Sequence, residues 1–311
     1  MAYQLSKINQ AIRSDVKGFL EECDAAYQRK IDDAAEQIIR NLPNSPLVLL
    51  SGPSGSGKTT TAMKIDDALE KRGVITQTIS MDNYFQTVSP ETTPRTADGS
   101  YDFESPLCMD MELLNEHFDA LARGKEIRIP RYDFCRQMRD TSRCTTLRLK
   151  ENEVAVFEGI HALNDDVAGR HPEATKIYIS ARSNILDGER LVFKGTWMRL
   201  TRRAVRDLNF RGSDILTTLA QWANVRRGEK LDISRFKHRA NVILDSSLPY
   251  EVSVMWHYAL PLFEAVPAEN PRRGELLEMI DAFQQLEPID PELVHPDSLI
   301  REFIGGGSYH Y

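Results

Sequence analysis

The sequence predicts an α/β fold in which helices cover both faces of a mainly parallel sheet. From residue 47 to about 247, short apolar runs alternate with helix-length amphipathic stretches. Several of these apolar runs are followed directly by polar residues that could carry chemistry, and helical patterns without strands flank the region on both sides. Such alternation is typical of a parallel sheet whose ligands bind at the carboxyl ends of its strands.

The composition is ordinary for a globular protein. The chain has 311 residues, of which 41% are hydrophobic and 27% charged, enough for one large domain or one domain with an appendage. Its net charge of −7 argues against a general nucleic-acid partner. The sequence has neither an apolar run of about 18 residues, which a membrane span would need, nor an apolar signal core. The expected location is therefore the cytoplasm. Four scattered cysteines suggest neither a zinc site nor a disulfide framework.

The elements can be placed in order, in three parts. Residues 1–45 form a helical segment, because apolar side chains recur every three or four residues from Ile8 to Leu42, as one long helix or two end to end. Residues 46–247 form the central domain, and residues 248–311 form a helical C-terminal extension. Strands are expected at 47–51, 74–80, 126–130, 145–149, 153–158, 175–180 and 241–245. Helices are expected at 58–72, 110–123, 184–208, 213–226, 250–265 and 274–286.

Two segments have no regular pattern. Residues 86–105 are polar and rich in turn residues, so we expect a surface excursion that serves as a lid or substrate loop. The triple glycine near the C-terminus cannot lie inside a regular element.

The most specific motif is a glycine-rich loop between the first predicted strand and the helix after it. Residues 52–59, GPSGSGKT, match the pattern Gly-x-x-x-x-Gly-Lys-Thr. Glycines allow successive backbone N–H groups to curl round a phosphate, and the N-terminus of the helix adds partial positive charge. An ordinary Gly/Ser turn would not need the lysine and both flanking elements. The motif therefore predicts a three-layer P-loop NTPase fold.

This loop predicts a site for a nucleoside triphosphate with Mg²⁺. Lys58 would reach the β- and γ-phosphates, and the Thr59 hydroxyl would complete the Mg²⁺ shell. The residues predicted to bind the nucleotide are Gly52, Ser54, Gly55, Ser56, Gly57, Lys58, Thr59 and Thr60.

Two acidic residues follow predicted strands. Asp82 comes just after strand 74–80 and could accept the proton of a substrate hydroxyl that attacks the γ-phosphate; the alternative is a residue of an Asx-turn. Glu158 ends strand 153–158 and suits Mg²⁺ or its water ligands; the alternative is an ordinary loop carboxylate. The nearby His161 belongs to no recognisable motif and is expected to be a surface or core histidine.

Arginines gather on one face of the helix predicted at 184–208. Arg199, Arg202, Arg203 and Arg206 fall within an arc of about 100°, and Leu200, Ala204 and Leu208 lie on the opposite side. Like charges at this spacing repel one another unless an anion offsets them, and a polyphosphate is the expected anion. The alternative is a solvated face with salt bridges to neighbours such as Asp207. Arg211 could extend the cluster as a movable lid.

Six segments in order resemble the uridine kinase/phosphoribulokinase family, particularly its uridine–cytidine kinase branch. They are GPSGSGKTT, SMDNYF, YDFESP, IPRYDF, VFEGIHAL and LTRRAVRDLNFRG. The N-terminal helix and the ending REFIGG resemble a longer bacterial subgroup. The resemblance implies that Lys58 and Thr59 bind ATP with Mg²⁺, that Glu158 lies on the Mg²⁺ side, and that Asp82 is the base that receives the proton of the 5′-hydroxyl.

The resemblance also implies a set of acceptor and lid residues. Glu104 would hold the ribose hydroxyls, Tyr132 would contact the base, and Gln221 would lie near it. Tyr84 and Arg203 would lie on the substrate side, and Arg206 and Arg211 would contact phosphate from a lid. Gln137 stands where the family has a histidine that reads the pyrimidine edge, and Ser213 where it has a second arginine. A glutamine differs from histidine in shape and does not titrate, so reading of the base should differ.

The resulting prediction is an ATP- and Mg²⁺-dependent kinase of a primary hydroxyl, with the 5′-hydroxyl of a nucleoside as the expected acceptor. One alternative is a kinase of another sugar-like or pantothenate-like alcohol. Another is a nucleotide-binding regulatory module without turnover. A nucleic-acid motor is disfavoured by the acidic charge, and a homo-oligomer is compatible with the sequence.

Overall fold

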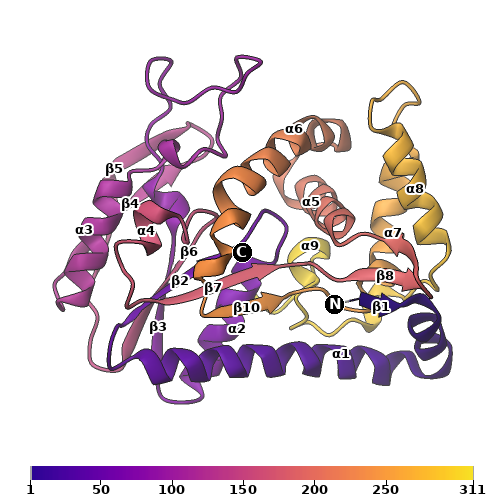
Figure 1. Cartoon of the computed structure of the whole chain (residues 1–311), viewed down its shortest axis with the longest axis horizontal. Coiled ribbons are helices and arrows are strands. Elements are labelled where there is room, and N and C mark those ends of the chain that lie inside the picture. Colours follow the sequence, from indigo (N-terminus) through magenta and orange to yellow (C-terminus); the bar gives the residue numbers. More distant parts are fainter. Residues whose placement is uncertain (1, 311) are drawn as a thin grey trace.

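The computed structural model describes residues 2–310, and its centre is a five-stranded sheet in which all neighbours are parallel. The strand order is β10-β7-β2-β6-β3 (Figure 1). The strands are β2 (Leu47–Ser51), β3 (Ile75–Ser80), β6 (Glu153–Glu158), β7 (Thr175–Ser180) and β10 (Val242–Asp245). β2 and β7 are buried along their whole length, as expected when helices cover both faces of a parallel sheet.

The two faces of the sheet belong to two hydrophobic clusters. Val48 and Leu50 of β2 point into one cluster and Leu47 and Leu49 into the other, because successive side chains of a strand alternate. The helices are α1 (Leu5–Asn41), α2 (Lys58–Glu70), α3 (Met111–Ala122), α4 (Asp165–Ala168), α5 (Gly195–Arg211), α6 (Ile215–Gly228), α7 (Glu251–Glu264), α8 (Arg273–Gln284) and α9 (Arg301–Ile304). The predicted three-layer α/β fold is thereby confirmed.

The N-terminal segment is the long helix that the sequence predicts. α1 spans 37 residues with one non-helical residue, Asp15, and lies along the bottom of the molecule in Figure 1. Its buried side chains, among them Tyr27, Ile31 and Ile38, belong to the same cluster as α2. Among residues 2–310, no helix is both long enough and apolar enough to cross a membrane.

Two predicted strands lie outside the parallel sheet. β4 (Ile127–Asp133) and β5 (Met138–Leu147) pair with each other in a separate antiparallel sheet of two strands. Both are longer than the predicted runs at 126–130 and 145–149, because their mostly polar outer ends carry no apolar run that would mark them as strand.

The helix predicted at 184–208 is wrong in its first part. Residues 184–193 form β8 (Asn184–Asp187) and β9 (Arg190–Phe193), which pair as a hairpin, and β8 also pairs with β1 (Ala2–Gln4). The physical reason is the turn at Asp187-Gly188, where Gly188 has a φ of 62° that favours glycine. The helix α5 therefore begins only at Gly195.

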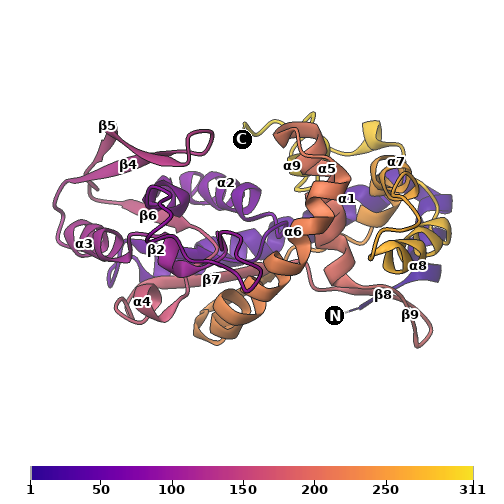
Figure 2. The same ribbon diagram turned by 90° about the horizontal axis from the view of Figure 1, so that it is seen from above.

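The C-terminal extension packs at the other end of the molecule from α3. α7 and α8 lie side by side, and the chain then returns through α9 toward α2 and α5, as both views show (Figures 1 and 2). The extension therefore contributes both to the core and to the surroundings of the glycine-rich loop.

Candidate functional site

The glycine-rich loop joins β2 to α2 and presents backbone rather than side chains. Gly55 and Gly57 have φ values of 74° and 80°, which favour glycine. A Cβ on Gly52 would clash with the carbonyl oxygen of Ile179, and one on Gly55 would lie 2.9 Å from the carbonyl oxygen of Arg199. Gly57 is the N-cap of α2 and, as a glycine, has no side chain that could accept from the first N–H groups of the helix. This geometry fits a loop whose N–H groups receive an anion.

Lys58, Asp82 and Glu158 come together beside this loop. Glu158 is in register with Leu50 of β2 and Ser80 of β3, and Asp82 follows two residues after Ser80. Burial raises the pKa of Glu158 to about 7, with Lys58 opposing the shift. Burial also lowers the pKa of Lys58, against the attraction of Glu158 and Asp82. Lys58 thus interacts with both carboxylates, and the charge of Asp82 raises the pKa of Glu158 further.

Among the described residues, no hydrogen bond within the turn that holds Asp82 uses the carboxylate of this residue. Burial raises the pKa of this carboxyl group, and Lys58 and Arg211 act in the opposite direction. The side chain that caps the turn is Ser80, whose Oγ accepts from the N–H of Asp82 at 3.4 Å. The alternative of an Asx-turn residue is therefore not supported.

Arg203 links the loop to α6. Its guanidinium donates to Ser54 Oγ at 3.1 Å and to Gln221 Oε1 at 2.9 Å. It also attracts Glu104, whose pKa is raised by burial. The structure thus brings together Arg203, Gln221 and Glu104, which the sequence predicts on the acceptor side.

Asp207 pairs with the lid arginines. Its carboxylate lies 3.2 Å from Arg203 Nε, 3.5 Å from Arg206 Nη2 and 3.6 Å from Arg211 Nη1. Burial lowers the pKa of Arg206 to about 10, and the positive charge of Arg211 adds to this effect. Arg206 also has Glu302 within reach, with Nη1 and Oε1 3.9 Å apart, so two carboxylates, Asp207 and Glu302, lie beside these three guanidinium groups.

The expectation that all four arginines await a polyphosphate is wrong for two of them. Arg199 pairs with Glu229 at 2.6 Å and Arg202 with Glu251, where Nη2 and Oε2 are 2.7 Å apart. Arg199 and Arg202 are both buried, so protein carboxylates offset their charge. Leu208 is exposed rather than part of a buried opposite face.

Three predicted acceptor residues do not join this cluster. Tyr84 is buried and its hydroxyl bonds His117 Nδ1 at 2.8 Å, so it belongs to the core. Tyr132 packs against Phe85 and Phe134, with ring centroids 5.6 and 5.0 Å away. Gln137 is exposed at the turn between β4 and β5, with a φ of 51°.

Sequence reasoning missed Glu302 of α9. Its Oε2 accepts from Thr60 Oγ1 at 2.6 Å and from the N–H of Thr60 at 3.3 Å, in the first turn of α2. Only the unexplained ending REFIGG could have pointed to it. The expectation of a core or surface histidine holds for His161, which is fully buried and whose pKa burial lowers to about 4.

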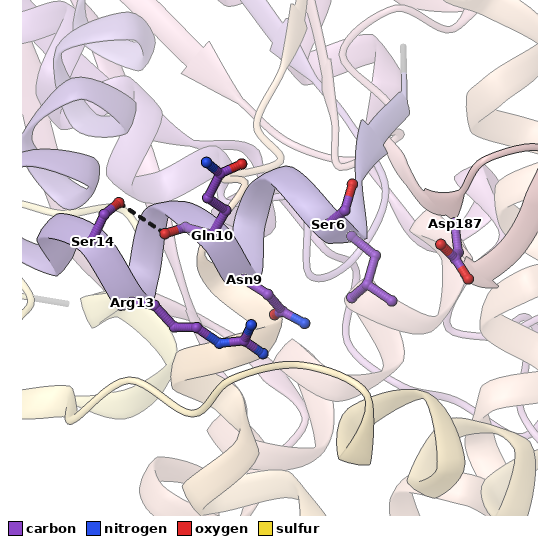
Figure 3. A pocket seen from close by; sticks show the side chains of 7 residues that line it. Ser6, Asn9, Gln10, Arg13, Ser14 and Asp187 are labelled. Carbon is purple, nitrogen blue, oxygen red and sulfur yellow. Dashed lines mark hydrogen bonds between the residues drawn. The ribbon is translucent and has the colours of Figure 1, made fainter.

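A groove at the start of α1 is not part of this site. The groove has a volume of about 480 Å³ and is lined by Ser6, Asn9, Gln10, Arg13 and Asp187 among others (Figure 3). It contains none of the predicted site residues. The candidate site is therefore the carboxyl edge of the parallel sheet.

Comparisons with known proteins give a family match that spans the parallel sheet. Residues 47–252 match the model of the phosphoribulokinase/uridine kinase family. The uridine kinase of Halobacterium salinarum is 30% identical over 196 residues, which are 63% of this chain and 77% of that protein. The uridine kinase of Deinococcus deserti is 29% identical over 201 residues, or 64% of this chain and 87% of that protein.

A solved structure shares the fold. It is that of a proposed fructose transport system kinase from Silicibacter sp., which has a TM-score of 0.50 and 18% identity and covers 69% of this chain and 98% of its own. With a glycine-rich loop on a parallel sheet and a family match over two-thirds of its length, this chain belongs to the phosphoribulokinase/uridine kinase family of P-loop kinases.

Proposed function

We propose that this chain transfers the γ-phosphoryl group of ATP to a primary hydroxyl of a small molecule, with the 5′-hydroxyl of a nucleoside as the acceptor. The observation that carries the proposal is the interaction of Lys58 at the start of α2 with Asp82 and Glu158, which follow β3 and end β6. A cation for the phosphates, a carboxylate for the attacking hydroxyl and a carboxylate for a metal ion are the groups that such a transfer needs.

The donor side would use the loop and the start of α2. Backbone N–H groups of the loop, together with Lys58, would hold the phosphates. Pro53 has no N–H to offer, and the N–H of Thr60 donates to Glu302. Thr59 and Glu158 would hold Mg²⁺, which when bound neutralises charge on the phosphates. Among residues 2–310 no group of three or more His, Cys, Asp or Glu side chains could hold a metal ion. Mg²⁺ commonly binds through one or two carboxylates together with phosphate oxygens.

On the acceptor side, Asp82 would orient the attacking hydroxyl and take its proton. Lys58 and Arg211 favour the ionised form of Asp82 that this role requires, because they oppose the upward shift of its pKa. Arg203 and Arg206 would stabilise charge on the transferring group, with Arg211 closing over it.

The choice of a nucleoside rests on the relatives, which are named uridine kinases, and on Glu104 beside Arg203, which suits ribose hydroxyls. Tyr84 lies in the core and Gln137 is exposed in a turn, so the two residues do not support reading of a base. The second candidate is therefore a kinase of another sugar-like or pantothenate-like alcohol. A regulatory module without turnover would not need the carboxylate of Asp82.

The test is release of ADP across a panel of nucleosides, sugars and pantothenate, with the wild type, Lys58→Ala and a control, Lys71→Ala. Lys71 is exposed at the end of the same helix. We expect turnover with nucleosides in the wild type and Lys71→Ala, and none in Lys58→Ala. If an alcohol other than a nucleoside is the one that is phosphorylated, that alcohol is the acceptor and the nucleoside assignment is wrong. Full activity of Lys58→Ala would overturn the proposed role of the loop.

A further inference from the structure

The C-terminal segment, Arg301–His310, lies outside the part of the chain that matches the family, yet it is fixed beside the phosphate-binding loop. Glu302 contacts Thr60 in the first turn of α2, and the Tyr309 hydroxyl donates to Asp67 Oδ2 at 2.6 Å, further along the same helix. On the other side, Asn209 of α5 donates to the carbonyl oxygen of Phe303 at 3.2 Å. The segment is therefore attached to both helices that border the candidate site, and Figure 2 shows its trace running from α9 past α5.

The three glycines allow the segment to turn back toward α2. Gly305 and Gly306 have φ values of 85° and 69°, which favour glycine. A Cβ on Gly305 would lie 3.2 Å from Cζ of Phe210. Arg301 holds the turn closed, since its guanidinium donates to the carbonyl oxygens of Gly305 at 3.2 Å and Pro291 at 3.0 Å.

A cavity of about 590 Å³ lies between this segment and the two helices. Thr59 of α2 and Arg206 line it near the loop, and Phe210, Gly306, Tyr309 and His310 line it further out. This volume is in the range of small-molecule sites. Glu104 and Gln221, the predicted acceptor residues, do not line it, so it is separate from the acceptor side.

We propose that this cavity receives the nucleoside of the donor nucleoside triphosphate and that the C-terminal segment forms its outer wall. The inference rests on the function proposed above. Phosphates held at the N-terminus of α2 place the nucleoside next to them, and this cavity opens beside Thr59. Phe210 is 57% exposed although it is aromatic, and a flat face of this kind suits stacking by a base. The guanidinium groups of Arg206 and Arg211 suit the phosphates that precede the nucleoside.

Calorimetric titration of the full chain with Mg²⁺-ADP and with Mg²⁺-tripolyphosphate tests this assignment, because only ADP carries a nucleoside. The variants are Phe210→Ala and Tyr309→Ala. The matched control is Leu208→Ala, because Leu208 is also exposed on α5 but does not line the cavity. We expect Phe210→Ala to weaken ADP binding about tenfold, the loss of one stacking contact. Tyr309→Ala should weaken it in the same direction, while tripolyphosphate binding stays unchanged in every variant.

The outcomes separate the two proposals. If the wild type binds both ligands and Phe210→Ala and Tyr309→Ala bind ADP as tightly as Leu208→Ala does, the cavity is not the nucleoside site while the loop keeps its role. If the wild type binds neither ligand, the proposed function itself fails, and the assignment of the cavity fails with it.

Discussion

At the scale of single residues, burial makes the protonated form of Glu158 the favoured one below about pH 7. Its folded pKa of about 7 lies above the value of about 4.5 for a free glutamate. The protonated form is therefore preferred in the folded protein, and the stability it gives is complete below about pH 4.5 and is lost as pH rises through about 7. A metal ion or a cationic ligand at this position would reverse the preference.

Glu158→Gln should remove this pH dependence. We expect the variant to gain stability over the wild type between pH 5 and pH 8, by up to about 3 kcal/mol, since each pKa unit corresponds to about 1.4 kcal/mol. Urea unfolding of both proteins without ligand across this range measures the difference. Glu151→Gln, at an exposed position, is the control. Parallel curves for wild type and Glu158→Gln would show that Glu158 is ionised in the fold throughout.

Asp82 gives the second prediction at this scale. Asp82→Asn keeps the size of the side chain but cannot accept a proton. We expect kcat to fall by about 10²–10⁴-fold, with little change in the KM for ATP, because general-base contributions are of this size. Steady-state kinetics with varied ATP measures both. A fall of less than about threefold would remove Asp82 from catalysis, and a large rise in KM would point to a role in binding the donor.

At the scale of elements, α5 divides its arginines between folding and chemistry. Arg202 is paired with Glu251 and both are fully buried. Arg206 has longer contacts, 3.5 Å to Asp207 and 3.9 Å to Glu302. The sequence predicts the arginine face but not this division, because the partners Glu229 and Glu251 lie 30 and 49 residues away from their arginines. Similarly, the hairpin at Gly188 depends on a single turn within an otherwise helix-like pattern.

Arg202→Ala should therefore lower the stability of the fold, whereas Arg206→Ala should lower kcat and leave stability intact. Removing one partner of a buried ion pair costs about 3–5 kcal/mol, so Arg202→Ala should unfold at much lower urea. Arg206→Ala should keep its stability or gain slightly, since its cation is disfavoured by burial and by Arg211, but should lose most of its kcat. Arg206→Lys should rescue activity only in part, because a point charge cannot replace the planar fork. Turnover and unfolding measured on the same samples decide this, and a fully active Arg206→Ala would contradict it.

At the scale of the whole molecule, the sequence predicts the central sheet well and its surroundings less well. Buried parallel strands are continuous apolar runs, so the five strands of the sheet fall within a residue or so of their predicted positions. The contact between Glu302 and Thr60 joins residues 242 positions apart. No local pattern encodes such a pairing, which arises only from packing of the extension.

This packing predicts that the three parts unfold together. One hydrophobic cluster contains Ile31 of α1, Val48 of the sheet, and Phe263, Phe283 and Phe303 of the extension. Cutting the chain to residues 46–247, the central domain predicted from the sequence, would expose this apolar surface to water on two sides, and each large side chain exposed costs about 1.5–3 kcal/mol. Typical domains have only about 5–15 kcal/mol to lose. We therefore expect the full chain to melt in one calorimetric transition and the shortened chain to show none. A shortened chain that melts cooperatively and binds Mg²⁺-ADP would show instead that the central domain folds alone and that both ends are appendages.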